Sequence, residues 1–357
     1  MKTDRRQFVA GLLATGLAPK PTWADAGSPR YLSAAALQDG TYALCGIDDA
    51  SKVTFQLPLP ARGHAAAAHP TRPEAVVFAR RPGTFAVVID CTTGSPKAML
   101  NARSNRHFYG HGTFSQDGSL LFTTENDFAA GRGVIGLWDV RAGYTRVDEW
   151  DSGGIGPHDI KRLPGRDTLV VANGGIDTHP DSGRTKLNIP TMQPNLTYIA
   201  DGAVIERMEL PQRMHKNSIR HLDVAADGRI AFGMQWQGDG PAEALLGVHS
   251  VGKQVSLMKA GENEMRDMQG YIGSIAFSDD GHKILVTSPR GGRAQLYDTQ
   301  SAQLIESHSL TDVCGVAAKK DGWLLTAGTG EIASLRQGSI PVPVATIMRW
   351  DNHLIPI

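Results

Sequence analysis

A strand–turn–strand pattern recurs along this chain and restricts its fold more than any other feature. The clearest copy spans residues 112–124, where two apolar runs flank the turn Asp117-Gly118. Tight Asp-Gly turns between such runs favour antiparallel strand pairs. The turns of the seven copies fall at positions 40, 71, 118, 165, 228, 281 and 322, at intervals of 31, 47, 47, 63, 53 and 41 residues.

Repeats of about 40 to 50 residues with roughly four short strands each are typical of β-propeller blades. The sequence therefore predicts an all-β, seven-bladed propeller with WD/YVTN-like repeats. Trp138-Asp139 and Tyr297-Asp298 resemble the WD ending of a third strand. A two-domain β-sandwich is the alternative, but it does not require seven copies in register. Because the first interval is short, we expect blade one to take its outer strand from residues 344–350.

The composition suits a globular, turn-rich protein. The chain has 40 Gly among 357 residues, above the roughly 7% of an average protein, and 41% of its residues are hydrophobic. Equal numbers of basic and acidic residues (36 each) argue against nucleic-acid binding. Three cysteines, Cys45, Cys91 and Cys314, are too few to staple the fold, and the sequence leaves open whether two of them pair.

The amino terminus resembles a twin-arginine export signal. Arg5-Arg6 precedes a mild apolar run over residues 9–18, which is shorter than the ~20 residues of a membrane span. Thr22-Trp23-Ala24 offers a cleavage site after Ala24. We therefore expect a signal peptide at residues 1–24, a propeller domain at 25–357, a periplasmic location and no membrane span. Cleavage leaves 32 basic against 35 acidic residues, a net charge of −3.

Four histidines occupy one position of the repeat. Seven residues before each turn, at the start of the innermost strand, stand Ser33, His64, His111, His158, His221, Ser274 and Gly315. Innermost strands surround the central channel, so these side chains should meet near its axis. Neutral imidazole is a common ligand of Zn, Cu, Fe and Ni, so two or three of the histidines with a carboxylate would hold a metal ion.

A structural role is the alternative for these histidines. In WD repeats a Gly-His pair often joins blades, but that histidine lies about a dozen residues before the turn glycine, outside the strand. Here the offset is seven residues, and related repeats carry a small residue at that position, which favours a ligand role.

The loops after the second strands should open at the same mouth. Glu125, or alternatively Asp127, is expected to complete the metal shell, and arginines there would hold an anion through paired hydrogen bonds. A 63-residue interval places an insertion at 174–195, interpreted as a flap over the mouth. Together these loops and the flap contribute the ligand-binding or supporting residues Arg80, Arg81, Asp127, Asn173, His179, Arg184, Gln235 and Arg290. Cys314 is interpreted as a buried thiol beside Gly315.

Several motifs together resemble the exported propellers grouped as "domain of unknown function 1513". They are Arg-Arg-Pro-Gly-Thr-Phe at 80–85, Arg-His-Phe-Tyr-Gly-His at 106–111, Gly-Ile-Gly-Pro-His at 154–158, Val-Ala-Asn-Gly-Gly-Ile at 171–176, Ser-Ile-Arg-His-Leu at 218–222, Gly-Tyr-Ile-Gly-Ser at 270–274, Ser-Pro-Arg-Gly-Gly at 288–292 and Asp-Val-Cys-Gly at 312–315. The resemblance covers nearly all of the chain after residue 24. It implies a periplasmic protein with imelysin-like or di-haem peroxidase-like partners in iron-related gene clusters, and it assigns no catalytic residues.

Three functions remain open at this point. The first is a periplasmic propeller that binds iron or copper, with zinc less favoured, for metal acquisition or a redox partner. The second is a metal-dependent, lactonase-like hydrolase that uses Glu125, Asn173 and the arginines around a metal-bound water. The third is a non-catalytic interaction scaffold. The sequence has no phosphate loop or dinucleotide fingerprint, so no nucleotide cofactor is expected.

Overall fold

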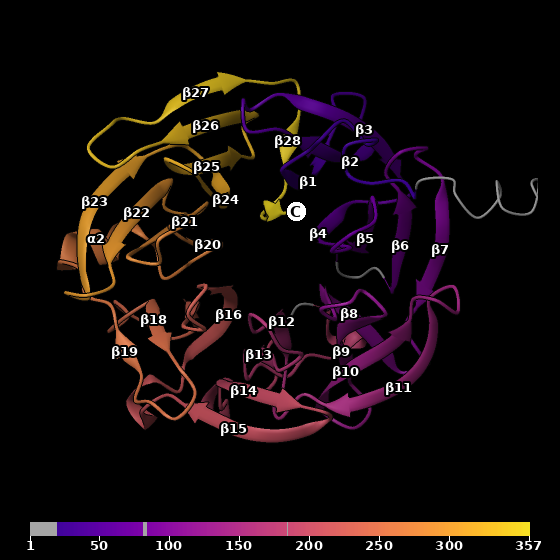
Figure 1. Ribbon diagram of the computed structural model, residues 1–357. Coiled ribbons are helices and arrows are strands. Elements are labelled where there is room, and N and C mark those ends of the chain that lie inside the picture. The colour runs from indigo at the N-terminus through magenta and orange to yellow at the C-terminus, as the bar shows by residue number, and fades with distance from the viewer. Residues whose placement is uncertain (1–19, 81–83, 184) are drawn as a thin grey trace, which may run out of the picture.

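The chain forms seven antiparallel sheets arranged as blades around a central channel (Figure 1). The structure is a computed structural model that describes residues 20–80, 84–183 and 185–357. The seven-bladed propeller predicted from the repeat is therefore confirmed. In this propeller the first strand of each chain repeat lies innermost in blades two to seven, and the fourth strand lies outermost.

The strands of the first four blades, from the channel outward, are β28 (Arg349–Trp350), β1 (Tyr31–Ala36), β2 (Tyr42–Ile47) and β3 (Val53–Leu59), with β29 (Ile355–Pro356) also on β1; β4 (Gly63–Ala68), β5 (Glu74–Ala79), β6 (Phe85–Asp90) and β7 (Pro96–Asn101); β8 (Arg106–Phe114), β9 (Leu120–Asp127), β10 (Arg132–Asp139) and β11 (Thr145–Asp151); and β12 (Pro157–Arg162), β13 (Leu169–Asn173), β14 (Asn195–Ala200) and β15 (Ala203–Glu209).

The strands of the last three blades are β16 (Asn217–Val224), β17 (Ile230–Trp236), β18 (Leu246–His249) and β19 (Ser256–Leu257); β20 (Ser274–Phe277), β21 (Lys283–Ser288), β22 (Arg293–Asp298) and β23 (Gln303–Ser309); and β24 (Val313–Lys319), β25 (Gly322–Ala327), β26 (Glu331–Leu335) and β27 (Val342–Ala345). The helical segments described are α2 (Glu262–Asp267) and the short 3-10 turns Pro180–Ser182, Ile189–Thr191 and Gln212–Met214. Among the described residues, no helix is long and apolar enough to cross a membrane.

The carboxyl-terminal segment closes the ring from the inside. β28 and β29 both pair with β1, and Figure 1 shows this end of the chain at the centre of the ring. The expectation that residues 344–350 supply an outer strand of blade one was wrong, because β3 already holds that place and β27 belongs to blade seven. The amino-terminal segment of blade one lacks the innermost strand instead, and β28 and β29 supply it. Ser33 consequently lies on a second strand, where its hydroxyl donates to the carbonyl of His353 at 2.8 Å.

The hydrophobic core lies between neighbouring blades. One cluster joins Val170 and Leu196 of blade four to Leu222 and Phe232 of blade five, and all four side chains are buried. Similar clusters link the other neighbouring blades, so each sheet is held on both faces. This packing fixes the innermost strands and therefore the side chains that they direct into the channel.

The three cysteines are buried and free. Burial raises the pKa of Cys314 to about 12, so its thiol is protonated at neutral pH. The interpretation of Cys314 as a buried thiol is confirmed. Trp23 donates from its indole to the carbonyl of His69 at 3.1 Å, a contact that the predicted cleavage after Ala24 would remove.

Candidate metal centre

Irregular pairing in the innermost strands accompanies each of the four predicted histidines. In β4, β8, β12 and β16 the register with the second strand shifts within the few residues around His64, His111, His158 and His221. Such a bulge leaves a residue out of the ladder and redirects its side chain. The repeat position therefore predicts correctly that these side chains meet at the axis.

Gly110 shows how closely these strands approach. Its φ is +101°, a conformation that non-glycine residues rarely adopt, and a Cβ there would lie 2.5 Å from Cδ2 of His64. Glycine at this position thus permits His64 and His111 to lie with their ring centroids 5.1 Å apart.

A fifth histidine joins the four. His353, between β28 and β29, lies with its ring centroid 4.7 Å from His64, 4.6 Å from His111 and 5.1 Å from His221. His111 neighbours all four other rings, at centroid distances of 4.6 to 6.2 Å. The repeat pattern does not identify His353, because this residue belongs to the blade whose strands come from both ends of the chain. Its only signal was its place after the last repeat.

Asp159 orients His111 and selects the tautomer of its neutral ring. Its Oδ1 lies 3.1 Å from Nδ1 of His111, and its two oxygens also accept from the backbone N–H groups of Ile160 and Leu222, at 2.8 and 2.9 Å. Although burial alone would raise it, the pKa of Asp159 lies below its ordinary value because of His111 and Lys161. An ionised carboxylate only accepts, so Nδ1 of His111 carries a proton, and in the neutral form of His111 the lone pair is on Nε2.

His158 has the opposite arrangement. Arg220 directs Nη1 at Nδ1 of His158, 3.2 Å away, and its Nε donates to the hydroxyl of Ser218 at 2.8 Å. A guanidinium only donates, so Nδ1 of His158 accepts and its proton is on Nε2. Metal binding by a neutral His158 would therefore require Arg220 to move.

Asp351 is the acidic residue nearest to His64 in this cluster. It lies 3.6 Å from Nδ1 of His64, beyond hydrogen-bond distance, and accepts from Arg80 at 2.8 Å and Arg62 at 2.7 Å. Burial opposes ionisation of Asp351, but His64 and the two arginines hold its pKa below the ordinary value.

Burial also keeps these imidazoles neutral. It lowers the pKa of His64, and it lowers the pKa values of His158, His221 and His353 well below the usual 6.5, with the positive charge of the neighbouring groups acting in the same direction. Neutral imidazole is the metal-binding form. His221 and His353 are therefore ready to bind a cation at neutral pH without first losing protons.

Two groups of three histidines bring their ring nitrogens within 4.8 Å of one another: His64, His111 and His158; and His111, His221 and His353. They share His111, whose one available nitrogen can serve only one of them at a time. The second group fits a metal better. Nε2 of His111, both nitrogens of His221 and Nε2 of His353 are buried without a hydrogen-bond partner, whereas His158 is bonded to Arg220.

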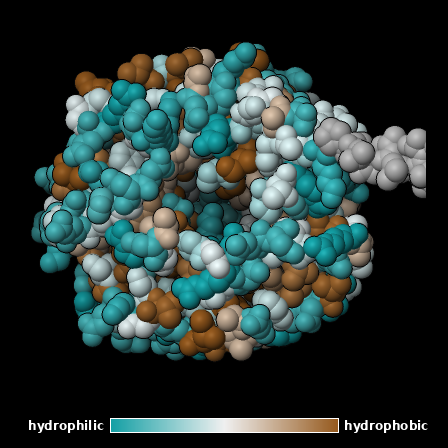
Figure 2. Space-filling view, viewed as in Figure 1, coloured by the Kyte–Doolittle hydropathy of each residue, from teal (hydrophilic) through white to brown (hydrophobic). Residues whose placement is uncertain are grey.

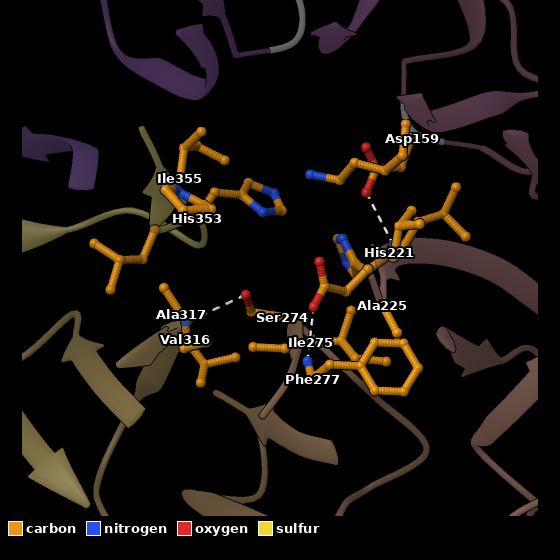
Figure 3. A pocket seen from close by; sticks show the side chains of 18 of the residues that line it. Asp159, His221, Ala225, Ser274, Ile275, Phe277, Val316, Ala317, His353 and Ile355 are labelled. Atoms are coloured by element: carbon orange, nitrogen blue, oxygen red, sulfur yellow. Dashed lines mark hydrogen bonds between the residues drawn. The ribbon is translucent and has the colours of Figure 1, made fainter. Parts of the chain in front are cut away.

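A cavity of about 260 Å³ adjoins the second group. Figure 3 shows His353 on one side of this space and His221 with Asp159 on the other. Asp223 also lines it and accepts from the backbone N–H of Phe277 at 2.7 Å. Burial raises the pKa of Asp223. A cation bound by the three histidines would thus keep an open side toward a cavity that both polar and apolar side chains line.

The other end of the channel opens into a second cavity, of about 320 Å³. Its lining includes Arg80, Gln235 and Arg290, three of the predicted loop residues, together with His64, His158 and His221. The blade-four insertion contributes Ile176, Thr178 and Lys186, so it does lie at this mouth. Figure 2 draws the face on which the chain ends, the side of the first cavity, and shows a hollow at its centre.

Other predicted site residues lie outside both cavities. Glu125 is buried and its carboxylate bonds Arg146 at 2.6 Å and Thr123 at 3.0 Å, so the expectation that it joins the metal shell is not supported by its position. Its ion pair and hydrogen bond hold it within blade three, between β9, β10 and β11.

Two further predicted residues also bond within or beside their own blades. Asp127 bonds Arg106 at 3.2 Å, and Asn173 bonds Ser152 and Asn195, each at 2.9 Å or less. His179 packs against Phe128 with a centroid distance of 4.9 Å. Arg81 and Arg184 lie outside the described residues.

Fold and site together define a seven-bladed β-propeller whose channel is filled by five histidines. The chain belongs to the family described as "Protein of unknown function (DUF1513)", whose model matches residues 57–357. No curated protein sequence matches it. A solved structure of hydrazine synthase from Kuenenia stuttgartiensis is similar, with a TM-score of 0.59 and 14% identity over 86% of this chain and 89% of that chain. At that identity the likeness shows the fold alone.

Proposed function

We propose that this protein binds one transition-metal ion in its channel through Nε2 of His111, Nε2 of His353 and a ring nitrogen of His221. The observation that carries the proposal is the set of buried, unpartnered nitrogens on these three rings. Burying a polar group without a hydrogen bond is unfavourable, so such a set makes sense when a cation completes it. Asp159 supports it, because carboxylates commonly orient metal-binding histidines.

Three neutral imidazoles suit Fe, Cu, Ni and Zn. We favour iron or copper over zinc, in a periplasmic accessory protein for metal acquisition or for a redox partner. The family resemblance supports this choice through its imelysin-like and di-haem peroxidase-like neighbours. Three protein ligands and an adjoining cavity leave a coordination position for water or an exchanging ligand, as in sites that are not purely structural.

Two of the residues assigned to the lactonase-like alternative lie away from the histidines. Glu125 and Asn173 bond partners within and beside their own blades, and neither lines a cavity at the histidines. A scaffold without chemistry would leave the unpartnered nitrogens unexplained.

The test is a metal titration of the purified, metal-free protein, with elemental analysis of the protein as isolated. We expect one iron or copper ion per chain in the wild type and none in His111→Ala or His353→Ala. His282→Ala removes an exposed imidazole that lines neither cavity and should bind like the wild type. Far-UV circular dichroism confirms that each variant is folded. No stoichiometric ion in the wild type, or full retention in both channel variants, would refute the proposal.

A further inference from the structure

Four cationic side chains from four different blades surround the mouth opposite the 260 Å³ cavity. Arg80 follows β5 of blade two, Lys186 belongs to the blade-four insertion, Arg220 lies on β16 of blade five and Arg290 follows β21 of blade six. Among the described residues that line this 320 Å³ cavity there is no Asp or Glu. The cavity falls within the size of small-molecule sites, about 300–1,000 Å³.

Two of these cations form no ion pair within the part of the chain that the structure describes. Within the described parts of the chain, no acidic side chain lies within ion-pair distance of Lys186 or Arg290. Lys186 bonds the neutral amide of Gln237, and Arg290 lies over the ring of Tyr271, 4.5 Å from its centroid. Burial and the nearby charges of Arg220 and Arg290 lower the pKa of Lys186. Like charges gathered around a concave surface repel one another, and a bound anion would relieve that repulsion.

The spacing of the charges indicates the kind of anion. A guanidinium pairs with a carboxylate through two parallel hydrogen bonds, and an ammonium adds a point charge. Cations contributed by several blades lie around the cavity, so one carboxylate reaches only part of them. An anion with several carboxylates on a short carbon frame reaches more of them at once. Its inner end would lie over His64 and His158, which line the same cavity.

We propose that this basic mouth is a binding site for a small polycarboxylate anion, with Lys186 and Arg290 as its principal contacts. This proposal rests on the charges around the mouth and not on the proposed metal function, and it adds a second ligand to the protein. It places an anionic ligand at the entrance of the channel, where a metal ion could arrive as a carboxylate chelate.

The experiment is an isothermal titration of citrate, a tricarboxylate, into the metal-free, full-length protein, beside an equal titration of acetate. We expect one saturable citrate site per chain and no saturable acetate binding. The double variant Lys186→Gln/Arg290→Gln should bind citrate at least tenfold more weakly, because both exposed side chains lose their charge. The control Lys52→Gln/Arg141→Gln removes the same charges from exposed positions elsewhere and should match the wild type.

The outcomes separate this site from the metal site. Absence of saturable citrate binding to the wild type, or equal affinity in the double variant, would overturn the anion site even where the metal titration succeeds. Citrate binding that persists in His111→Ala while metal binding is lost would support both sites. Citrate binding by a wild type that binds no metal would support the anion site and refute the proposed function.

Discussion

Replacing Asp159 with asparagine tests how the fold prepares His111 for a metal. In the wild type the carboxylate accepts from Nδ1 of His111 at 3.1 Å and from the backbone N–H of Leu222 at 2.9 Å. Asparagine keeps one acceptor and replaces the other with an NH₂ group, which cannot accept. In Asp159→Asn, either His111 or Leu222 therefore loses its acceptor, and the carboxylate's charge is lost.

The magnitude follows from these contacts. Loss of a carboxylate that orients a metal-binding histidine typically weakens metal binding 10- to 100-fold, equivalent to about 1.4–2.7 kcal/mol. A lost hydrogen bond to a charged group should also lower the free energy of unfolding by about 1.5–3 kcal/mol. We therefore expect Asp159→Asn to fold, to melt at a lower temperature and to bind the metal 10- to 100-fold more weakly.

The assay is a competition titration with a chelating dye at pH 7.5, paired with thermal melts of the metal-free protein. Asp223→Asn is the matched control, because Asp223 lines the same cavity but bonds the backbone of Phe277. Its metal affinity should change less than threefold. Equal affinities of Asp159→Asn and the wild type, or equal losses in the two variants, would show that Asp159 does not prepare His111.

Three further perturbations have definite expected results. Acidification should lower the melting temperature of the metal-free protein as the pH falls below about 6.5, because burial depresses the histidine pKa values and the unfolded chain then binds more protons; a flat profile between pH 7 and 5 would contradict this. Gly110→Ala should destabilise the fold by about 1–3 kcal/mol in denaturant titrations, because φ is +101° and a Cβ meets His64; a change under about 0.5 kcal/mol would refute the backbone argument. Glu125→Gln should cost about 1.5–3 kcal/mol of stability, because the hydrogen bond with Arg146 loses the carboxylate charge while Arg146 keeps Glu149, yet leave metal affinity unchanged; lost metal binding in a folded variant would restore Glu125 as a ligand.

The fold could be predicted because each blade repeats one local pattern. Strand alternation and Asp-Gly turns are properties of short segments, so copies such as residues 112–124 identify blades without any long-range information. Ring closure could not be predicted in this way. Pairing of β28 and β29 with β1 joins segments more than 300 residues apart, and two-residue strands carry no pattern of their own.

The candidate site likewise contains residues that the repeat predicts and residues whose place depends on contacts distant in the sequence. His111 and His221 were predicted because they share a repeat position, and the fold brings equivalent positions together at the axis. His353 was missed because its strand comes from the far end of the chain. Glu125 remains a predicted ligand that its position does not support, since sequence places it near the mouth but cannot show that Arg146 on β11 of the same blade forms an ion pair with it.

Anomalous diffraction from crystals of the metal-loaded protein tests the central claim most directly. We expect a single strong peak, measured at the absorption edge of the bound metal, about 2.0–2.1 Å from Nε2 of His111 and from ring nitrogens of His221 and His353. A peak outside the channel, a peak without His111 among its ligands, or no peak at full metal loading would contradict the proposed site.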